Sequence, residues 1–306
     1  MKAVQFDRFG GPEVLEVRDV ERPHAGPGEV MVAVRAASIN PGEIAVREGL
    51  LEARWPTTLP CGEGSDLAGV VEEVGEGSAE FGVGDEVCGW VDTRSSHAEF
   101  ALAPTTQLVA KPANVSWEAA GSLHVAPFAA YAGVKSVALE RGDVVGVSAA
   151  AGGVGSVAVQ LAVRAGAKVL GLASERNHDW LRAMGAIPVT YGDGQAERLR
   201  EAAGGPIDAF IDNFGSGYAD LAIELGVAPH RINTIAEYAA VQRLGVRGDG
   251  TAAVSNKATL QELADLLGAG ELEIAVERTY PLAEVREAYV ELAKRTTRGK
   301  IVLLIG

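Results

Sequence analysis

The sequence predicts an α/β protein with two domains: a barrel-like antiparallel domain, and a doubly wound parallel sheet covered by helices on both faces. The chain has 306 residues, a length typical of about two domains. Short valine-rich runs dominate the chain up to Trp117, and strand and helix patterns alternate after it. The two kinds of structure are therefore expected to meet near this residue.

Strands are expected in the first part of the chain wherever a short β-branched run is bounded by turn residues. Clusters such as 9–12 (FGGP) and 26–28 (GPG) separate these runs, and 82–87 (GVGDEV) is typical of a turn that leads into another strand. Regular short strands with such turns favour a barrel-like antiparallel domain. The expected strands span residues 1–6, 14–20, 30–36 and 70–74.

The second part of the chain opens with an apolar, alanine-rich stretch that predicts a helix from Trp117 to about Ala138. Strands are expected over 144–149, 169–173, 207–211 and 231–235, with helices over 154–165, 179–184 and 218–225 between them. Such alternation predicts a parallel sheet. A further helix is expected over 260–267. The final run, 299–305, predicts a strand that returns to the first domain, because no helix follows it.

Charge and composition argue against several classes of protein. The net charge is −14, which disfavours nonspecific binding to nucleic acid or to an anionic membrane. The uncharged run 144–163 has the length of a membrane span, but its four glycines, two serines and one glutamine favour a buried strand and helix. The N-terminus lacks the apolar core of a secretion signal. Two cysteines fit a reducing cytoplasm and cannot form a four-thiolate zinc site.

A glycine-rich turn between the first strand and the first helix of this parallel sheet predicts a dinucleotide site. The run 150–155 (AAGGVG) departs from the usual pattern only in its first position, Ala150. Gly152 lets the backbone approach a pyrophosphate, Gly155 lets the helix pack against the strand, and the helix N-terminus supplies free N–H groups. The residues expected to bind the cofactor phosphates are Ala151, Gly152, Gly153 and Val154. The alternative is a tight structural turn.

The end of the next expected strand distinguishes the two nicotinamide dinucleotides. A cofactor without a 2′-phosphate usually meets an acidic residue there, about 20 residues after the turn. The chain has Ser174 at this position, followed by Glu175, Arg176 and Asn177. Arg176 and Asn177 can donate hydrogen bonds to a phosphate, whereas Glu175 would repel one if it turned inward. We therefore predict NADPH as the cofactor, with Ser174, Arg176 and Asn177 at its 2′-phosphate.

The chain resembles the medium-chain dehydrogenase/reductase superfamily, and within it the zinc-free quinone oxidoreductase branch that includes zeta-crystallin. The similarity extends over essentially the whole chain. Its motifs are 27–30 (PGEV), 36–41 (AASINP), 66–75 (DLAGVVEEVG), 83–87 (VGDEV), the glycine turn followed by 160–162 (QLA), and 298–303 (RGKIVL). The resemblance implies a GroES-like catalytic domain formed by 1–122 and 255–306, a Rossmann NADP(H)-binding domain formed by 123–254, and often a homodimer.

The resemblance also implies that no zinc is bound. Zinc members of the superfamily have a cysteine ligand where this chain has Asn40, and a Gly-His-Glu segment where it has Gly64, Ser65 and Asp66. Their structural cysteine cluster is missing too. Zn²⁺ stabilises the alkoxide when a simple alcohol is oxidised. Without it, direct hydride transfer from NADPH is expected to an acceptor that delocalises negative charge, such as a quinone or a conjugated enone.

Four further residues have open interpretations. In this branch the asparagine matching Asn40 lies near the nicotinamide and could hydrogen-bond the acceptor oxygen; the alternative is a turn residue before Pro41. Asp66 is interpreted as a packing or capping residue rather than a functional one. His124 is either a proton donor, since histidine titrates near neutrality, or a structural residue of an apolar helix. Asn213, after the fourth strand of the Rossmann domain, could contact the ribose.

The sequence therefore predicts a cytoplasmic NADPH-dependent oxidoreductase that reduces quinones or similar conjugated carbonyls without zinc. The alternative among enzymes is an enoyl or alkenal reductase on the same scaffold, which would need a proton donor for the second carbon. From a different class comes a low-turnover NADPH-binding protein with a structural or regulatory role. The expected partner is a small quinone or enone, with neither nucleic acid nor membrane.

Overall fold

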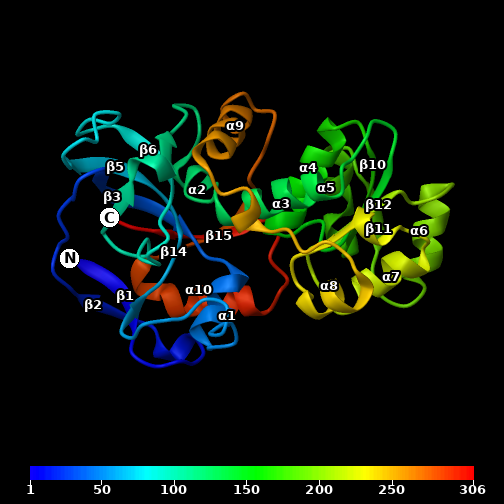
Figure 1. Ribbon diagram of the computed structural model, residues 1–306, viewed down its shortest axis with the longest axis horizontal. Helices are drawn as coiled ribbons and strands as arrows, with labels where there is room; N and C mark the ends of the chain where they lie inside the picture. Colours follow the sequence, from blue (N-terminus) through cyan, green and yellow to red (C-terminus); the bar gives the residue numbers. More distant parts are fainter. The chain divides into compact units, whose positions relative to one another are not determined.

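The computed structural model describes residues 1–306, and these divide into two compact units. Unit 1 consists of Met1–Val125 together with Asn256–Gly306, and unit 2 consists of Ala126–Ser255. Both ends of the chain therefore build unit 1, drawn in blue, cyan and orange to red in Figure 1, and the middle of the chain builds unit 2.

Unit 1 is built mainly from antiparallel strands. A seven-stranded sheet has the order β14-β15-β3-β5-β6-β8 with β7 paired to β3, and a three-stranded sheet has the order β2-β1-β4. The strands of the larger sheet are β3 (Glu29–Ser38), β5 (Asp66–Val74), β6 (Glu86–Trp90), β7 (Phe100–Pro104), β8 (Leu108–Ala110), β14 (Val276–Pro281) and β15 (Lys300–Leu304). Those of the smaller sheet are β1 (Lys2–Phe6), β2 (Glu16–Asp19) and β4 (Cys61–Gly62).

The C-terminal strand returns to the sheet formed by the first part of the chain. β15 pairs antiparallel with β3, so that Val302 lies opposite Ser38. On its other side, β15 pairs parallel with β14. The strand expected over 299–305 and its return are thus confirmed. This pairing also brings Lys300 to the end of β3, next to Asn40.

Four helices complete unit 1: α1 (Pro41–Arg47), α2 (Trp117–Ala120), α9 (Lys257–Gly268) and α10 (Val285–Ala293). α9 confirms the helix expected over 260–267. α10 was not predicted from the sequence, although Val285, Ala288, Tyr289 and Leu292 are spaced as on one helix face and pack on the core. Tyr289 belongs to the core of the unit, together with Phe6, Leu15 and Leu67.

The expectation of one helix from Trp117 to about Ala138 is wrong. α2 ends at Ala120, and a separate helix, α3 (Val125–Ser136), follows after a break. The break packs its backbone against β3: the Ser38 N–H donates to the Gly121 carbonyl oxygen over 2.9 Å. A Cβ at Gly121 would lie 2.5 Å from the carbonyl oxygen of Ala36, so this close approach requires glycine.

Unit 2 is built around a parallel sheet of five strands in the order β11-β10-β9-β12-β13. In chain order this is 3-2-1-4-5, so the direction of the winding reverses beside β9, and ligands bind at such a switch point outside the carboxyl ends of the strands. The strands are β9 (Val144–Val147), β10 (Lys168–Ala173), β11 (Ile187–Thr190), β12 (Ala209–Asp212) and β13 (Ile232–Thr234). The predicted fold class is confirmed.

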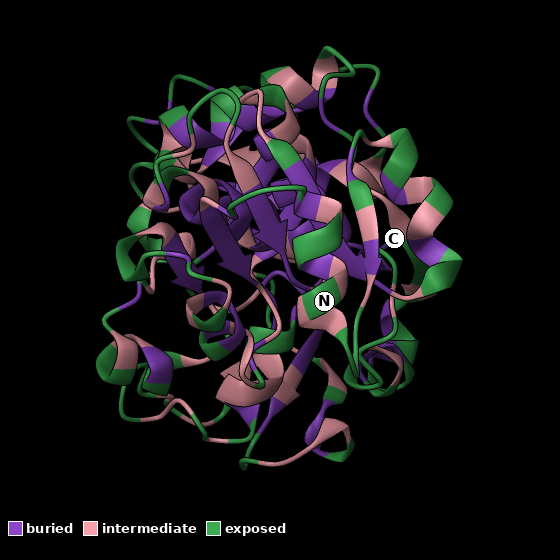
Figure 2. Ribbon diagram, turned by 90° about the vertical axis from the view of Figure 1, so that its right-hand side faces the viewer, coloured by how far each residue is buried: buried purple, intermediate pink, exposed green.

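Helices surround this sheet, and their outward faces are exposed, while the strands other than the edge strand β11 are largely buried (Figure 2). They are α3, α4 (Gly153–Arg164), α5 (His178–Ala183), α6 (Gln195–Ala203), α7 (Tyr218–Glu224) and α8 (Tyr238–Leu244). α6, α8 and β11 were not predicted from the sequence. Pro188 lowers the strand signal of β11, but β11 is an edge strand, where proline is tolerated.

No helix in the chain combines the length and the apolar character that a membrane crossing requires. The uncharged run 144–163 contains β9, the glycine turn and most of α4, as its composition led us to expect.

Candidate functional site

The turn between β9 and α4 forms the first part of a candidate nucleotide site. α4 begins at Gly153, and its N-cap residue Gly152 has an extended backbone and no side chain that could cap the helix. The first N–H groups of a helix have no partner within the helix, and together with the helix dipole they attract anions. The N–H groups of Gly153 and Val154 are therefore suited to hold a phosphate.

Two glycines of this turn have different surroundings. A Cβ at Gly155 would lie 2.1 Å from the carbonyl oxygen of Ala149, so the packing of α4 against the turn requires glycine there. A Cβ at Gly152 would meet only this same oxygen, at 3.3 Å. The packing of the chain therefore needs Gly155, whereas the space beside Gly152 stays open for a ligand.

A buried carboxylate joins three strand ends at the same edge of the sheet. Asp212, at the end of β12, accepts hydrogen bonds from the hydroxyl of Ser148 after β9 and from the hydroxyl of Thr234 in β13, both over 2.7 Å. It also accepts the backbone N–H groups of Phe214 and Gly215. Asp212 was not among the residues predicted from the sequence; its signal was an acidic residue directly after a mostly apolar run, 207–211.

Asn213 follows this carboxylate and lies at the same edge. Its backbone N–H donates to the Ser148 hydroxyl over 2.9 Å, and its amide nitrogen donates to the Ser148 carbonyl oxygen over 3.2 Å. Its amide oxygen is buried and accepts no hydrogen bond within the chain. Because buried polar atoms are rarely left without partners, this oxygen is suited to accept a hydrogen bond from a ligand hydroxyl.

The segment predicted to meet the 2′-phosphate follows β10 as a short helical turn, Glu175–Asn177. Asn177 is buried, and its amide nitrogen donates to the Ser174 hydroxyl over 3.2 Å. Arg176 and Glu175 are both exposed. Asn177 is thus partly engaged in holding the turn, and of the three predicted ligands Arg176 is the one at the surface.

In unit 1, a buried polar network surrounds Asn40, which is 2% exposed. Its amide nitrogen donates to Asp66 over 2.8 Å and to Glu43 over 3.2 Å. Its amide oxygen accepts a 2.5 Å hydrogen bond from the ammonium group of Lys300. Lys300 also donates to the carbonyl oxygen of Ile39 over 3.0 Å. Lys300 was not predicted as a site residue, although it lies within the RGKIVL motif.

Asp66 is the acceptor that links this network to the start of α3. One carboxylate oxygen accepts from Ser38 Oγ and Asn40 Nδ2, each over 2.8 Å. The other accepts the backbone N–H groups of His124 and Val125, at 3.0 and 2.7 Å. Since Val125 is the first residue of α3, this geometry favours the interpretation of Asp66 as a capping residue.

The network continues to a second group of buried titratable side chains. The backbone N–H of Asn40 and the hydroxyl of Tyr289 both donate to Glu43, each over 2.7 Å. The guanidinium of Arg47 lies over the Tyr289 ring, 4.4 Å from its centre, and donates to Glu63. Burial raises the pKa of Glu63 to about 8, although Arg47 opposes this shift. Burial also raises the pKa of Tyr289 well above its ordinary value.

His124 stacks on Trp90, with ring centres 4.5 Å apart and ring planes 8° from parallel. Burial lowers the pKa of His124 to about 4, and the nearby Asp66 only partly offsets this. A histidine with this pKa is neutral at pH 7 and has no imidazolium proton to give. The geometry therefore favours the structural interpretation of His124 over that of a proton donor.

The residues at the positions of the zinc ligands do not suit a metal ion. The amide oxygen of Asn40 is bonded to an ammonium group, and Ser65 stands where zinc-dependent relatives have a histidine. The neighbouring Asp66 already accepts four hydrogen bonds. No three histidine, cysteine, aspartate or glutamate side chains of the chain come together so that they could hold a metal ion. This donor set therefore does not fit Zn²⁺, which prefers thiolate and imidazole ligands.

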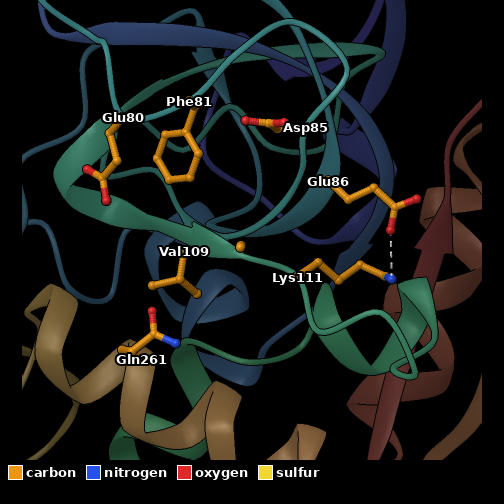
Figure 3. Close-up of a pocket in the computed structure, with 8 residues that line it drawn as sticks. Glu80, Phe81, Asp85, Glu86, Val109, Lys111 and Gln261 are labelled. Atoms are coloured by element: carbon orange, nitrogen blue, oxygen red, sulfur yellow. Dashed lines mark hydrogen bonds and ion pairs between the residues drawn. The ribbon is translucent and has the colours of Figure 1, made fainter.

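A separate cavity of about 460 Å³ opens on unit 1 between β8 and α9 (Figure 3). Its wall carries Phe81, Val109 and Gln261, the acids Glu80, Asp85 and Glu86, and Lys111. Lys111 donates to Glu86 over 3.0 Å, the contact drawn as a dashed line. No residue of the network around Asn40 lines this cavity.

The chain combines two parts. One is a dinucleotide-type parallel sheet with an uncapped glycine turn, and the other is an antiparallel unit with a buried polar network. Together they form the architecture of a two-domain nucleotide-dependent oxidoreductase. Comparison with known families agrees. Residues 26–136 match the alcohol dehydrogenase GroES-like domain, and residues 184–303 match the zinc-binding dehydrogenase family.

Relatives of known name or structure extend over the whole chain. A quinone oxidoreductase of Pseudomonas aeruginosa is 31% identical, covering 99% of both chains. A 2-haloacrylate reductase of a Burkholderia species is 29% identical over 99% of this chain and 98% of its own. A mycobacterial protein solved in complex with NADPH is 29% identical, with a TM-score of 0.88 and 99% of each chain covered. The chain belongs to the quinone oxidoreductase branch of the medium-chain dehydrogenase/reductase superfamily and is an enzyme of that family.

Proposed function

We propose that this protein reduces quinones or similar conjugated carbonyls with NADPH, by direct hydride transfer and without zinc. The observation that carries the proposal is the bonding of Asn40. At the position of a zinc ligand in metal-dependent relatives, the Asn40 amide is held between Lys300 and Asp66. Such a site suits an acceptor that delocalises the incoming negative charge, because an alkoxide would need a strong electrophile.

The nucleotide part of the proposal rests on the carboxyl edge of the sheet in unit 2. The N–H groups of Gly153 and Val154, beside Ala151 and Gly152, would hold the pyrophosphate. The amide oxygen of Asn213 would accept from the ribose. When bound, NADPH supplies the hydride. Since a mycobacterial relative is solved with NADPH, the same cofactor is the best-supported one for this chain.

Selection of NADPH over NADH is proposed to depend on Arg176, with Ser174 beside it. Arg176 is exposed at the end of β10 and carries a charge that a 2′-phosphate would neutralise. Asn177 would contribute less, because its amide already donates to Ser174.

A second candidate is reduction of the carbon–carbon double bond of an enone, enal or enoyl thioester. It is favoured by the relative named 2-haloacrylate reductase, which is similar over the whole chain. This reaction needs a proton at the second carbon, and His124 is neutral at pH 7 and stacked on Trp90, so it is a poor donor. Reduction of a carbon–carbon double bond is therefore the less favoured of the two reactions.

The test compares NADPH oxidation by the purified protein with a naphthoquinone, an alkenal and an enoyl thioester. The proposal expects the naphthoquinone to have the highest kcat/KM. Turnover of the enoyl thioester alone would replace the proposal with the second candidate. Tight NADPH binding without turnover of any acceptor would indicate the structural or regulatory role instead.

Family membership also leads us to propose a homodimer. Light scattering coupled to size-exclusion chromatography measures the molar mass directly. A monomer with a mass near 31.7 kDa would contradict the homodimer and leave the proposed reaction untouched.

A further inference from the structure

The amide group of Asn40 has no hydrogen-bond donor left for a substrate. An amide nitrogen has two protons, and those of Asn40 are directed to Asp66 and Glu43. Its oxygen accepts from Lys300. At 2% exposure, this amide is held in one orientation by its neighbours rather than by water. Any role of Asn40 toward the acceptor therefore depends on what holds it.

Lys300 is the cation that holds it. Its side chain is buried in β15, at 4% exposure, and two of its three ammonium protons go to Asn40 Oδ1 and Ile39 O. A buried ammonium is destabilising unless it is paired and hydrogen-bonded. Burial lowers the pKa of Lys300, and the negative charges that oppose this shift are those of Asp66 on β5 and Glu43 on α1. Burial of the Lys300 ammonium therefore costs free energy, and a side chain needed only to fill the space would not carry this charge.

The charges of Lys300 and Asp66, on either side of the Asn40 amide, favour one of its two possible orientations. If the amide turned over, its N–H groups would face the ammonium of Lys300 and its oxygen would face the carboxylate of Asp66. Both contacts would be repulsive, whereas the observed orientation makes both attractive. Glu43, which also accepts the Asn40 backbone N–H, favours the same orientation.

We propose that Lys300 is a positioning residue of this enzyme: it orients the Asn40 amide and supplies a fixed positive charge beside Asn40, the position of a zinc ligand in zinc-dependent relatives. This inference rests on the proposed function and adds a residue to it. Lys300 acts through Asn40 and Asp66, and it contributes to hydride transfer by keeping the polar wall of the acceptor site in one arrangement.

The test uses three substitutions that separate charge from hydrogen bonding. Lys300→Met removes both, Lys300→Gln keeps an N–H donor without charge, and Lys300→Arg keeps the charge in a different shape. Lys111→Met is the matched control, since Lys111 is also a buried, ion-paired lysine of unit 1 but lies outside the network. For each variant, kcat, KM and their pH profiles with a naphthoquinone are measured, along with the Kd for NADPH and the thermal midpoint.

The proposal expects Lys300→Met to lower kcat at least tenfold while the Kd for NADPH stays within about twofold, because the nucleotide site lies in unit 2. Lys300→Gln and Lys300→Arg should each recover part of kcat. Lys111→Met should remain within twofold of wild type. The alkaline limb of the kcat profile should be lost with Lys300, whose positive charge is favoured by Asp66 and Glu43. Glu43 in turn faces Tyr289 and His97, and Asp66 also faces His97.

Wild-type kcat and an unchanged pH profile in folded Lys300→Met would overturn the proposal. If that variant does not fold, the same result in Lys300→Gln overturns it. An equal loss of kcat in Lys111→Met would also overturn the proposal, because a general loss of stability would then explain the effect of both substitutions. If the wild-type protein turns over no acceptor, both the proposed function and this role of Lys300 are refuted. If the wild type and the Lys300 variants are equally active, only the role of Lys300 is refuted.

Discussion

The hydroxyl of Ser148 donates a 2.7 Å hydrogen bond to the buried carboxylate of Asp212, and this contact joins the carboxyl ends of β9 and β12. The same carboxylate accepts from Thr234 on β13. Ser148 begins the turn that leads to Gly152, and the residue after Asp212 is Asn213. One buried acid thus aligns the two segments of unit 2 that are proposed to hold the pyrophosphate and the ribose.

Substitution of this acid is expected to affect stability and nucleotide binding together. In Asp212→Asn, an N–H group replaces one acceptor, so at least one buried donor loses its partner, at a cost of about 1–3 kcal/mol. We expect a lower free energy of unfolding and a clearly higher Kd for NADPH, measured by urea denaturation and fluorescence titration. Asp208→Asn is the control: Asp208 accepts from Val144 at the opposite end of β9, so its loss should leave the Kd for NADPH nearly unchanged. Equal Kd values for the two variants would contradict the assignment.

The two glycines of the turn allow packing and ligand binding to be separated. Gly155→Ala places a Cβ 2.1 Å from the Ala149 carbonyl oxygen, and overpacking of this kind costs about 1–3 kcal/mol, so the thermal midpoint should fall. Gly152→Ala meets only a 3.3 Å contact and should keep the midpoint within a few degrees. It should nevertheless raise the Kd for NADPH roughly tenfold or more, since the new methyl group occupies the space next to the phosphate. Unchanged NADPH binding in Gly152→Ala would show that the cofactor lies elsewhere.

The selection of NADPH can be tested at the end of β10. A hydrogen bond to a charged group contributes about 1.5–3 kcal/mol, so Arg176→Ala should raise the Kd for NADPH about tenfold with little effect on NADH. Glu175→Ala, at the neighbouring exposed position, should leave NADPH binding unchanged or tighten it. Equal effects of Arg176→Ala on both cofactors would refute the role of Arg176 at the 2′-phosphate.

The buried acid Glu63 should make the stability of the protein depend on pH. Its pKa is about 8 in the folded chain and near 4.5 in an exposed one, so the folded state holds an extra proton between these values. The free energy of unfolding therefore falls as pH rises from about 5 to about 8. Glu63→Gln should flatten this dependence in thermal midpoints measured across that range, whereas Glu80→Gln, at an exposed ion pair, should not. A wild-type slope retained in Glu63→Gln would mean that Arg47 keeps Glu63 ionised.

His124 should contribute a pH dependence of opposite sign. Its pKa is about 4 in the folded protein and 6.5 in an exposed histidine, so the unfolded state binds an extra proton between these values. Stability is therefore lost as pH falls from 6.5 towards 4, by about 2 kcal/mol at pH 5. His124→Phe keeps an aromatic ring against Trp90 and should lose less stability between pH 7 and pH 5 than wild type does. His24→Gln, at an exposed histidine, is the control. If His124→Phe lost as much stability between pH 7 and pH 5 as wild type does, the assignment to His124 would be contradicted.

Features with a local pattern were predictable from the sequence. The strand, glycine turn and helix around Gly152 lie within one short stretch of chain, so the alternation of apolar runs was enough to find them. The same holds for α9 and for the C-terminal strand. The prediction failed where local pattern and tertiary packing disagree: the break in the helix at Gly121 depends on the approach of β3, and β11 contains a proline that only an edge strand accepts.

The sequence by itself determined the fold class, the family and the place of the glycine turn, because these follow from patterns of residues that are near one another in the chain. Only the tertiary structure decided the partners of the polar residues. Asn40 and Lys300 are 260 positions apart, and Ser148 and Asp212 are 64 apart, yet each pair is in hydrogen-bond contact. No periodicity encodes such a contact, because it depends on which strands pair. The buried charge that orients Asn40 therefore became visible only when β15 was placed beside β3.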